Sequence, residues 1–452
     1  MTSPHQQVAV IGTGMAGLVI AYILRNDPRG RFDVQVFEKQ DKLSLDSASH
    51  TLTDSKTGEK SERLDLPMRA FADGYYESLR RMYDYFGITY GSPRFIYALS
   101  TLSNAQADPY FIHSSNNHQL PPLRPNGLSW ISWLIEVCYL AVCYYWFTAC
   151  CFFVTPHTAE SAGTEETLRQ YVDRIRLPQY YVANYLLPLM SSVTTCSHEA
   201  LMDFPAVDLV DYERRTFRQK HYTVLGGVHR VQAKLSENLT HTLGAKVTAV
   251  ENVGTKVQVS WTNTDGQSNS RLFDHVILGV TPDVVGAIFQ PLRSAMAAVP
   301  TAKVQSVVHR DFSRILNASQ SIWKQMSWGS GESAPQPIHM CSKDGATESI
   351  HEHPSSALIT TYPIAPIDPE KVEYTATFTR VLRSAASRQI VNRIFGRRSA
   401  DEKSQLWRNG DGNVWLVGGW CWDGMVMLEG CLASATRVAN ALDVEVPWMK
   451  SS

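Results

Sequence analysis

A glycine-rich segment near the start of the chain places the strongest constraint on its fold. Residues 8–38 read VAVIGTGMAGLVIAYILRNDPRGRFDVQVFE, in which a short apolar run precedes glycines and then apolar residues at helical spacing. The glycines are Gly12, Gly14 and Gly17, in the spacing G-x-G-x-x-G. The first glycine permits a tight turn, the second lets the backbone approach a pyrophosphate, and the third lets the helix pack close to the strand. The segment therefore predicts a strand–turn–helix unit that binds a dinucleotide.

A carboxylate follows the second strand of this unit. The sequence predicts that strand over residues 33–37, and Glu38 stands at its end. A carboxylate in this place accepts hydrogen bonds from an adenosine ribose and disfavours a 2′-phosphate, so NADP is not expected. The backbone N–H groups of Met15 and Ala16, at the start of the helix, should face the phosphates. The unit thus predicts a site for an ADP moiety, which FAD and NAD share.

The size and charge of the chain narrow its class. Its 452 residues suffice for two or three lobes around a large core. The net charge of −1 at pH 7 gives no general attraction for nucleic acid, so no nucleic-acid partner is expected. The eight cysteines lack the paired spacing of a metal site, so we expect reduced thiols and no metal. The N-terminal MTSPHQQ passes directly into the first strand, which favours a cytoplasmic protein without a signal peptide.

The most unusual segment is the apolar run Leu128–Val154, in which Glu136 is the one charged residue. About 20 apolar residues suffice to cross a bilayer. Three interpretations are open: a core helix that covers an apolar substrate chamber, a segment attached to one membrane surface, and a spanning helix. We favour the core helix. The spanning helix is disfavoured because the lobe that begins upstream is completed downstream, which puts both flanks on one side of a membrane.

Four further segments extend the pattern over the rest of the chain. They read LDLPMRAF at 64–71, HYTVLGGVHRV at 221–231, DHVILGVTP at 274–282 and VGGWCWDGMVMLEG at 417–430. In this order the segments resemble the FAD-dependent amine-oxidase-like flavoproteins, whose FAD-binding fold is of the glutathione-reductase type. They are more closely similar to a poorly characterised NAD/FAD-binding branch of that superfamily, and more distantly to the polyunsaturated fatty acid isomerases. The resemblance spans almost the whole chain and implies FAD as the cofactor.

The resemblance implies an α/β (α+β) fold with two lobes. A Rossmann-type FAD-binding lobe would consist of residues 1–90, 221–300 and 405–452. A substrate lobe of mixed sheet and apolar helices would consist of residues 91–220 and 301–404, with the apolar run inside it. In the superfamily the last helix points its N-terminus at the flavin pyrimidine ring and stabilises negative charge on the reduced flavin.

The resemblance also implies further contacts with FAD, and the chain departs from the superfamily pattern in two places. The contacts would come from Lys39, Pro67, Met68, Arg69, Val247, Gly419, Met427 and Leu428. A Gly-Gly-Arg or Gly-Gly-His turn usually follows the ribose-binding acid, but residues 43–47 here read LSLDS. True amine oxidases place an aromatic residue just before the last Glu-Gly, where this chain has Met427 and Leu428. An aromatic cage for an amine is therefore not expected.

Few catalytic side chains are expected, because the flavin carries the hydride or proton chemistry. Arg69 would pair with flavin N1/O2 or with a substrate carboxylate, or else would be a surface arginine. Lys303 stands where amine oxidases carry a lysine bonded through water to flavin N5, although the local match is loose. His309 would form an acid–base pair with Asp311 or, as the simpler alternative, would be a structural histidine.

Three aromatic residues are candidates for contacts with the substrate. Trp420 and Trp422 would wall the flavin or, alternatively, pack inside a buried turn. Tyr75 would donate a proton or simply pack. Together with the apolar run and the missing amine cage, these residues predict a hydrophobic substrate such as a polyketide, a terpenoid or a fatty acyl compound.

The sequence therefore predicts an FAD-dependent oxidoreductase, meaning a dehydrogenase or oxidase of hydrophobic small molecules in secondary metabolism. Among enzymes, the alternative is a redox-neutral double-bond isomerase or cyclase that acts on a similar substrate. From another class, the alternative is a non-catalytic, membrane-associated protein that binds flavin or lipid. The altered segment 43–47 keeps this last alternative open.

Overall fold

The structure is a computed structural model that describes most of the chain. The described residues are 5–53, 60–103, 106–114, 122–316, 319–320, 322, 335–396 and 407–449. In these residues the strands form a parallel sheet of five strands, a mixed sheet of seven strands and three smaller antiparallel sheets. The predicted α/β class, with a parallel sheet that starts at the N-terminus, is confirmed.

The parallel sheet collects strands from three distant parts of the chain. In spatial order they are β10 (Thr240–Thr242), β2 (Phe32–Phe37), β1 (Gln6–Ile11), β14 (His275–Leu278) and β20 (Val414–Leu416). β1 lies at the centre, and its apolar residues from Val8 to Ile11 are buried, as expected for a parallel strand that is covered on both faces. The loops that follow β1, β2, β14 and β20 therefore meet at the carboxyl edge of one sheet, where open α/β sheets bind ligands.

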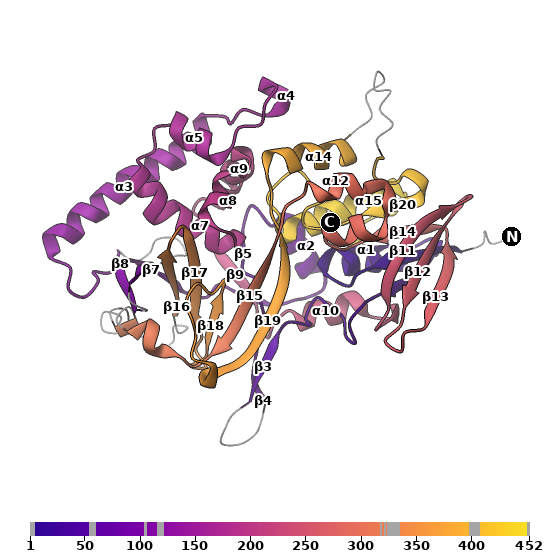
Figure 1. Ribbon diagram of the computed structural model, residues 1–452, viewed down its shortest axis with the longest axis horizontal. Coiled ribbons are helices and arrows are strands. Elements are labelled where there is room, and N and C mark those ends of the chain that lie inside the picture. The colour runs from indigo at the N-terminus through magenta and orange to yellow at the C-terminus, as the bar shows by residue number, and fades with distance from the viewer. Residues whose placement is uncertain are drawn as a thin grey trace.

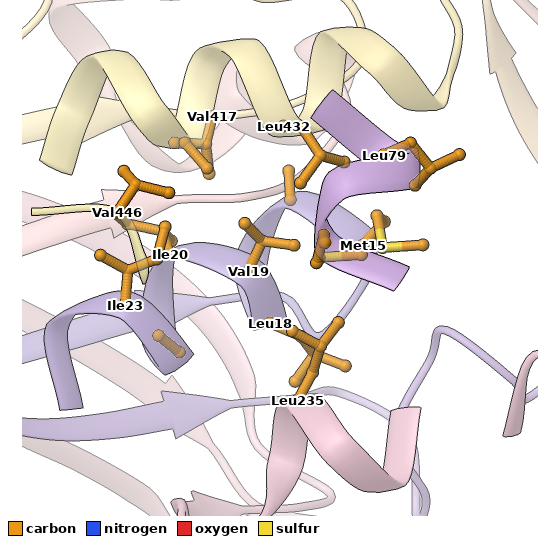
Figure 2. Close-up of a cluster of buried hydrophobic side chains, with 14 of the residues drawn as sticks. Met15, Leu18, Val19, Ile20, Ile23, Leu79, Leu235, Val417, Leu432 and Val446 are labelled. Carbon is orange, nitrogen blue, oxygen red and sulfur yellow. The ribbon is translucent and has the colours of Figure 1, made fainter. Parts of the chain in front are cut away.

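Helix α1 (Met15–Arg25) follows β1 and is buried on almost every side. It packs against α15 (Leu428–Ala441), α10 (His229–Ser236) and α2 (Glu77–Tyr85) through one cluster of apolar side chains. Figure 2 shows Leu432 of α15, Leu235 of α10 and Leu79 of α2 around the side chains of α1. This cluster draws on residues from Val8 to Trp448, so segments near the end of the chain complete the unit that begins with β1 and α1.

The remaining elements of this half surround the parallel sheet. An antiparallel sheet of β11 (Lys246–Val253), β12 (Lys256–Thr262) and β13 (Ser268–Phe273) lies at one edge of the molecule (Figure 1). The other elements are α11 (Pro282–Ile288), α12 (Arg293–Ala297), α14 (Ala385–Phe395), and the small sheets β3 (His50–Thr53) with β4 (Lys60–Leu64) and β5 (Phe71–Ala72) with β9 (His221–Val224) and β6 (Tyr90–Gly91).

The second half is built on the seven-stranded sheet. Its spatial order is β19 (Val372–Val381), β15 (Thr301–His309), β18 (Leu358–Thr361), β17 (Ala346–Glu352), β16 (Gln336–Lys343), β7 (Phe95–Ser103) and β8 (Gln106–Ser114). Its strands are antiparallel except for the pair β16–β7. A group of helices lies beside it: α3 (Trp130–Phe153), α4 (Ala159–Ala162), α5 (Leu168–Arg174), α6 (Gln179–Tyr181), a π-helical turn (Val182–Leu186), α7 (Leu187–Thr194), α8 (His198–Met202) and α9 (Ala206–Thr216).

The apolar run forms one long helix, α3, at the opposite edge of the molecule from the β11–β13 sheet (Figure 1). Only one side of α3 is buried, through Leu140, Cys143, Phe147, Cys150 and Cys151. Most residues on the other side of the helix are exposed, so the interpretation as a core helix is wrong for its outer side. Among the described residues, α3 is the one helix that is long and apolar enough to cross a membrane.

A buried group of charges joins the two halves. Arg383, which is 2% exposed, donates to the carbonyl oxygens of Trp422 and Gly424 at 2.9 Å. Its Nε lies 3.8 Å from Asp208 at the start of α9, and Arg388 of α14 lies 3.4 Å from the same carboxylate. Because an unpaired buried charge is costly, these contacts hold the turn before α15 firmly against the helical group.

Candidate dinucleotide-binding site

Two of the three motif glycines are required by the close packing of the turn. Gly12 has a φ of +95°, and a Cβ there would lie 2.8 Å from the carbonyl oxygen of Gly279. A Cβ at Gly17 would overlap the carbonyl oxygen of Gly12. At Gly14, by contrast, no described atom lies within 4 Å of the Cβ position. The space in front of Gly14 is therefore open, as it must be if a pyrophosphate approaches this backbone.

The start of α1 lies beside this open space and has no side-chain cap for its first backbone N–H groups. Gly14 precedes the helix and has no side chain to cap it, and the first turn of α1 contains no acidic residue. The first N–H groups of a helix have no partner within the helix and carry the positive end of its dipole. The turn therefore fits a phosphate group, which accepts such hydrogen bonds.

Glu38 lies at the end of β2, beside the glycine turn, and is 4% exposed. Its carboxylate accepts a hydrogen bond from the backbone N–H of Thr13 at 3.2 Å and another from the Thr13 hydroxyl at 2.6 Å. The N–H of Gln40 donates to the other carboxylate oxygen at 3.1 Å. Lys39, next to Glu38, is exposed. The carboxylate thus stands where it would accept hydrogen bonds from the adenosine ribose of a dinucleotide.

Val247 reaches the same end of the parallel sheet. The N–H of Ala245 donates to the carbonyl oxygen of Glu38 at 2.8 Å, which fixes the start of β11 beside the end of β2. Val247 is half-buried and packs against the cluster that contains Phe37. The structure therefore brings Val247 close to Glu38, on the adenosine side of the candidate site.

Residues 43–47, which lack the glycine turn expected from the resemblance, fold against the glycine-rich segment. The N–H of Ser44 donates to the Thr13 hydroxyl at 2.8 Å. The Leu45 side chain is 2% exposed and belongs to the same apolar cluster as Met15. The hydrogen bond from Ser44 and the buried side chain of Leu45 thus hold this loop against the glycine-rich turn after β1. The loop approaches that turn without glycine residues of its own.

Arg69 is half-buried beneath this loop and is not a surface residue. One guanidinium nitrogen donates to the carbonyl oxygen of Leu45 at 2.6 Å, and Nε has no hydrogen-bond partner among the described residues. Burial lowers the pKa of Arg69, and the nearby Asp65 opposes that shift. Pro67 and Met68, which precede it, are also half-buried, and Met68 packs against the helical group. Within the described chain Arg69 forms no ion pair, so its charge is available to an anionic ligand.

A second arginine, Arg380 on β19, was missed by sequence reasoning. Its guanidinium donates to the carbonyl oxygens of Val193 at 3.0 Å and Thr194 at 3.1 Å, and lies 3.9 Å from the Met427 sulfur. Burial lowers the pKa of Arg380, and Tyr76 is the largest opposing influence. None of its described partners is a carboxylate. The sequence did contain a pattern that could have identified Arg380. Side chains alternate along β19, and every second residue faces the same side, namely Tyr374, Ala376, Phe378 and Arg380.

The second glycine turn brings the start of α15 to the start of α1. A Cβ at Gly430 would lie 2.5 Å from the carbonyl oxygen of Gly419, so the first turn of α15 packs on the backbone of the turn that precedes it. Helices α1 and α15 pack against each other through one apolar cluster. Burial raises the pKa of the Cys431 thiol to about 12, while hydrogen bonds from the N–H groups of Ala16 and Gly419 oppose that shift. Cys431 therefore marks the point where the first turns of α1 and α15 meet. Two helix N-termini converge there on one region.

Met427 and Leu428 stand at the boundary where α15 begins, and Glu429 follows them. The Glu429 carboxylate accepts hydrogen bonds from the N–H groups of Ser78 at 2.9 Å and Leu79 at 3.1 Å. These donors belong to the first turn of α2, which has no side-chain cap of its own. Burial raises the pKa of Glu429. Glu429 thus anchors α2 against α15, and Met427 and Leu428 remain as the residues that face Arg380 and the apolar cluster.

The three aromatic candidates are engaged in packing. Trp420 is 3% exposed and donates its indole N–H to the carbonyl oxygen of Val280 at 3.2 Å. Trp422 donates to the carbonyl oxygen of Met425 at 2.9 Å and packs edge to face with Tyr75. Tyr75 is 1% exposed, and its hydroxyl has no partner among the described residues. These contacts match the packing alternatives given for the three residues.

The structure does not bring Lys303 or His309 to this group of residues. Lys303 is exposed and donates to Thr379 at 2.7 Å, on the face of the β15–β19 pair opposite to Arg380. His309 is 1% exposed, its Nε2 lies 2.7 Å from the Thr360 hydroxyl, and its Nδ1 accepts the N–H of Asp311. Burial lowers the pKa of His309 to about 4. This is the pattern of a structural histidine.

Comparison with known proteins adds one finding. A family model described as an NAD(P)-binding Rossmann-like domain matches residues 10–86. No curated protein matches the sequence. The matched segment contains the glycine turn, Glu38 and Arg69, and it ends with α2. The chain therefore carries a dinucleotide-binding domain of the kind found in flavin- or NAD(P)-dependent oxidoreductases.

Proposed function

We propose that the protein is an FAD-dependent oxidoreductase that acts on a hydrophobic small molecule, such as a polyketide, a terpenoid or a fatty acyl compound. The observation that carries the proposal is the convergence of two helix N-termini, those of α1 and α15, at Ala16 and Cys431. The α1 end fits the ADP part of a dinucleotide. The α15 end supplies a second set of backbone donors for the reactive end of the same molecule. The resemblance to amine-oxidase-like flavoproteins favours FAD over NAD.

Bound FAD would supply the capacity to accept a hydride. The chain's own residues would orient the reacting groups and set the local charge. Arg69 and Arg380 carry positive charge to this region, and within the described residues neither pairs with a carboxylate. Two such arginines favour an anionic group, either of the cofactor or of the substrate. A substrate with a carboxylate or an enolic oxygen and an apolar body fits this combination best.

The apolar surroundings support a hydrophobic substrate. Met190 packs against two apolar clusters, that around α1 and that of the helical group, and Met68 packs against the second of these. Methionine side chains adapt to irregular apolar shapes. A substrate that lies between the two halves would therefore meet methionine on one side and the start of α15 on the other.

The function is tested by reduction of the purified protein in the absence of oxygen. An oxidoreductase loses its flavin absorbance near ~450 nm when a substrate is added, and it regains the absorbance in air. Arg69→Met and Arg380→Met should weaken substrate binding by about tenfold each, because each removes one charged partner. Lys303→Met is the matched control, since Lys303 lies on the opposite face of the β15–β19 pair. A flavin that no hydrophobic compound reduces would contradict the proposal.

Product mass separates this proposal from redox-neutral chemistry. Oxidation removes about 2 Da from the substrate, whereas isomerisation or cyclisation leaves its mass unchanged. A product of unchanged mass, formed without net loss of flavin absorbance, would assign the site to an isomerase or cyclase. A protein that binds flavin but converts no substrate would be the non-catalytic binding protein.

A further inference from the structure

The outer side of α3 presents a continuous apolar stripe to solvent. Its members recur at alternating spacings of four and three residues, so they lie on one side of the helix. They are Ile131, Ile135, Cys138, Val142, Tyr145, Ala149 and Phe152. Ile131 is 74% exposed and Val142 is 71% exposed, so the stripe is not covered by any other described part of the chain. A large exposed apolar surface of this kind is typical of an interaction site.

The stripe carries no charge, because the one charged residue of α3 is directed inward. Glu136 accepts a hydrogen bond from the Tyr180 hydroxyl at 3.0 Å and another from the Tyr185 hydroxyl. Thr148, on the inner side of the helix, meets Glu213 of α9. The inner side of α3 is thus anchored to the helical group by polar and apolar contacts, while the outer side is mostly apolar and carries no charge.

Basic residues flank the stripe at both ends and at its middle. Near the N-terminus of α3, the Arg124 guanidinium lies 4.7 Å from the ring centre of Trp130. At the middle, the Trp146 indole donates to the carbonyl oxygen of Ile175, which is followed by the exposed Arg176. Arginine and tryptophan side by side are typical of the boundary between the apolar and the headgroup layers of a membrane.

The C-terminal end of α3 adjoins the strongest basic cluster. Phe152 packs edge to face with Phe217, and Arg218 lies over the Phe217 ring. Arg214, Arg218 and Lys220 are exposed, and among the described residues they form no ion pair. Arg215 is the exception, since it pairs with Asp211. The positive charges therefore exceed the negative ones beside this end of the stripe.

We propose that the outer side of α3 lies on the surface of an anionic lipid bilayer, with the helix parallel to the membrane plane. The stripe enters the boundary of the acyl chains, and the flanking basic residues contact anionic headgroups. A spanning orientation does not fit, because the inner side of α3 packs on α9, whose own surface carries Asp211, Arg214 and Arg215. Delivery of a hydrophobic substrate from the bilayer is a consequence, and this consequence rests on the proposed function.

The experiment is co-sedimentation of the full chain with lipid vesicles. We expect binding to vesicles with about one third phosphatidylserine, and about tenfold weaker binding to pure phosphatidylcholine. Binding should fall as the salt concentration rises toward ~0.5 M, because salt screens the basic residues. Ile135→Glu with Val142→Glu should abolish binding. Val253→Glu with Leu272→Glu is the matched control and should leave it unchanged, since these exposed apolar residues lie on the β11–β13 sheet at the other edge of the molecule.

A charge-reversal pair tests the headgroup contacts separately. Arg218→Glu with Lys220→Glu should weaken binding to anionic vesicles about tenfold and leave binding to neutral vesicles unchanged. Lys234→Glu with Arg293→Glu, two exposed basic residues outside the helical group, should change neither. A polarity-sensitive dye on Cys138, which is the exposed cysteine of the chain, should shift its emission to shorter wavelength on anionic vesicles.

Three results would overturn the proposal. They are equal binding of the wild type and the Ile135→Glu/Val142→Glu variant, equal binding to neutral and anionic vesicles, and no binding to either. In the last case, a dimer in analytical ultracentrifugation that the same double variant dissociates would assign the stripe to a second copy of the chain. Because vesicle binding is measured without substrate, these results do not depend on the proposed oxidoreductase activity. Circular dichroism of each variant checks that it is folded.

Discussion

Helices α1 and α3 are both strongly apolar, but they meet different surroundings. α1 is enclosed by a sheet and three helices drawn from residues 6 to 441, and nine of its residues are buried. α3 is longer and equally apolar, yet only its inner side is covered. Apolar composition therefore indicates that removing a helix surface from water is favourable, but it does not indicate what covers that surface. For α1 the cover is the chain itself, whereas for α3 we propose a lipid bilayer.

The largest difference between the two regions should be seen in thiol reactivity. Cys138 lies on the exposed stripe of α3, whereas burial raises the pKa of Cys431, beside α1, to about 12. The thiolate is the reactive form, so at neutral pH Cys431 should hold about a thousandfold less of it than an ordinary thiol. Alkylation at pH 7 should label Cys138 within minutes and leave Cys431 unmodified. The Cys431 rate should rise about tenfold per pH unit up to pH 12, because deprotonation increases with pH.

Mass spectrometry of peptides after timed alkylation measures both rates. The Cys138→Ser variant should lose the fast phase and keep its melting temperature. Comparable labelling of both thiols at pH 7 would mean that the surroundings of the half-buried Cys431 do not raise its pKa, and the contrast between the two helices would not hold.

The next difference concerns the stability that is lost when one leucine of each helix is replaced by alanine. Leu18 of α1 is fully buried, and Leu18→Ala should lower the free energy of unfolding by about 3 kcal/mol, because it removes apolar contacts and leaves a cavity. Leu134 of α3 is 56% exposed, and Leu134→Ala should cost less than about 0.5 kcal/mol. Denaturant unfolding without lipid measures both values. Equal losses would show that α3 is covered in solution, for example by a second copy of the chain.

The smallest difference concerns the stability contributed by two carboxylates, Glu429 at the start of α15 and Glu136 on the inner side of α3. Glu429 is 6% exposed and accepts two backbone N–H groups at the start of α2, so Glu429→Ala should cost about 2 kcal/mol. Glu136 accepts two tyrosine hydroxyls, one from the buried Tyr185 and one from Tyr180, which is 50% exposed, so Glu136→Ala should cost about 1 kcal/mol. Thermal unfolding ranks the two variants. A larger loss for Glu136→Ala would mean that the inner side of α3 is held more firmly than the start of α2.

The features that the sequence predicted correctly are local. The strand–turn–helix unit follows from Gly12 and Gly17, whose replacement the turn geometry does not permit. The position of Glu38 at the end of the second strand follows from the same short segment. Such features depend on neighbours within about thirty residues, and the spacing of a motif fixes them.

The features that escaped prediction depend on long-range register and packing. A shift of one residue along β15 decides whether Lys303 faces Arg380 or the opposite side, and no local pattern fixes that choice. Arg380 joins the site only because β19 pairs with β15 and meets the start of α15. The one-sided exposure of α3 likewise depends on how far the helical group extends along it. The sequence left three interpretations of this run open and favoured the core helix, which does not hold for the exposed outer side.

The visible absorption spectrum of the purified protein, compared with that of Gly14→Asp, tests the central claim most directly. The Cβ of an aspartate at position 14 meets no described atom, so the fold should persist, but its carboxylate would stand where a pyrophosphate approaches. Ser294→Asp, at an exposed position on α12, is the control. Flavin bands near ~450 nm are expected in the wild type and in Ser294→Asp, and their loss is expected in a folded Gly14→Asp protein. A folded Gly14→Asp protein with an unchanged flavin spectrum, or a wild type that takes up no FAD, would contradict the central claim.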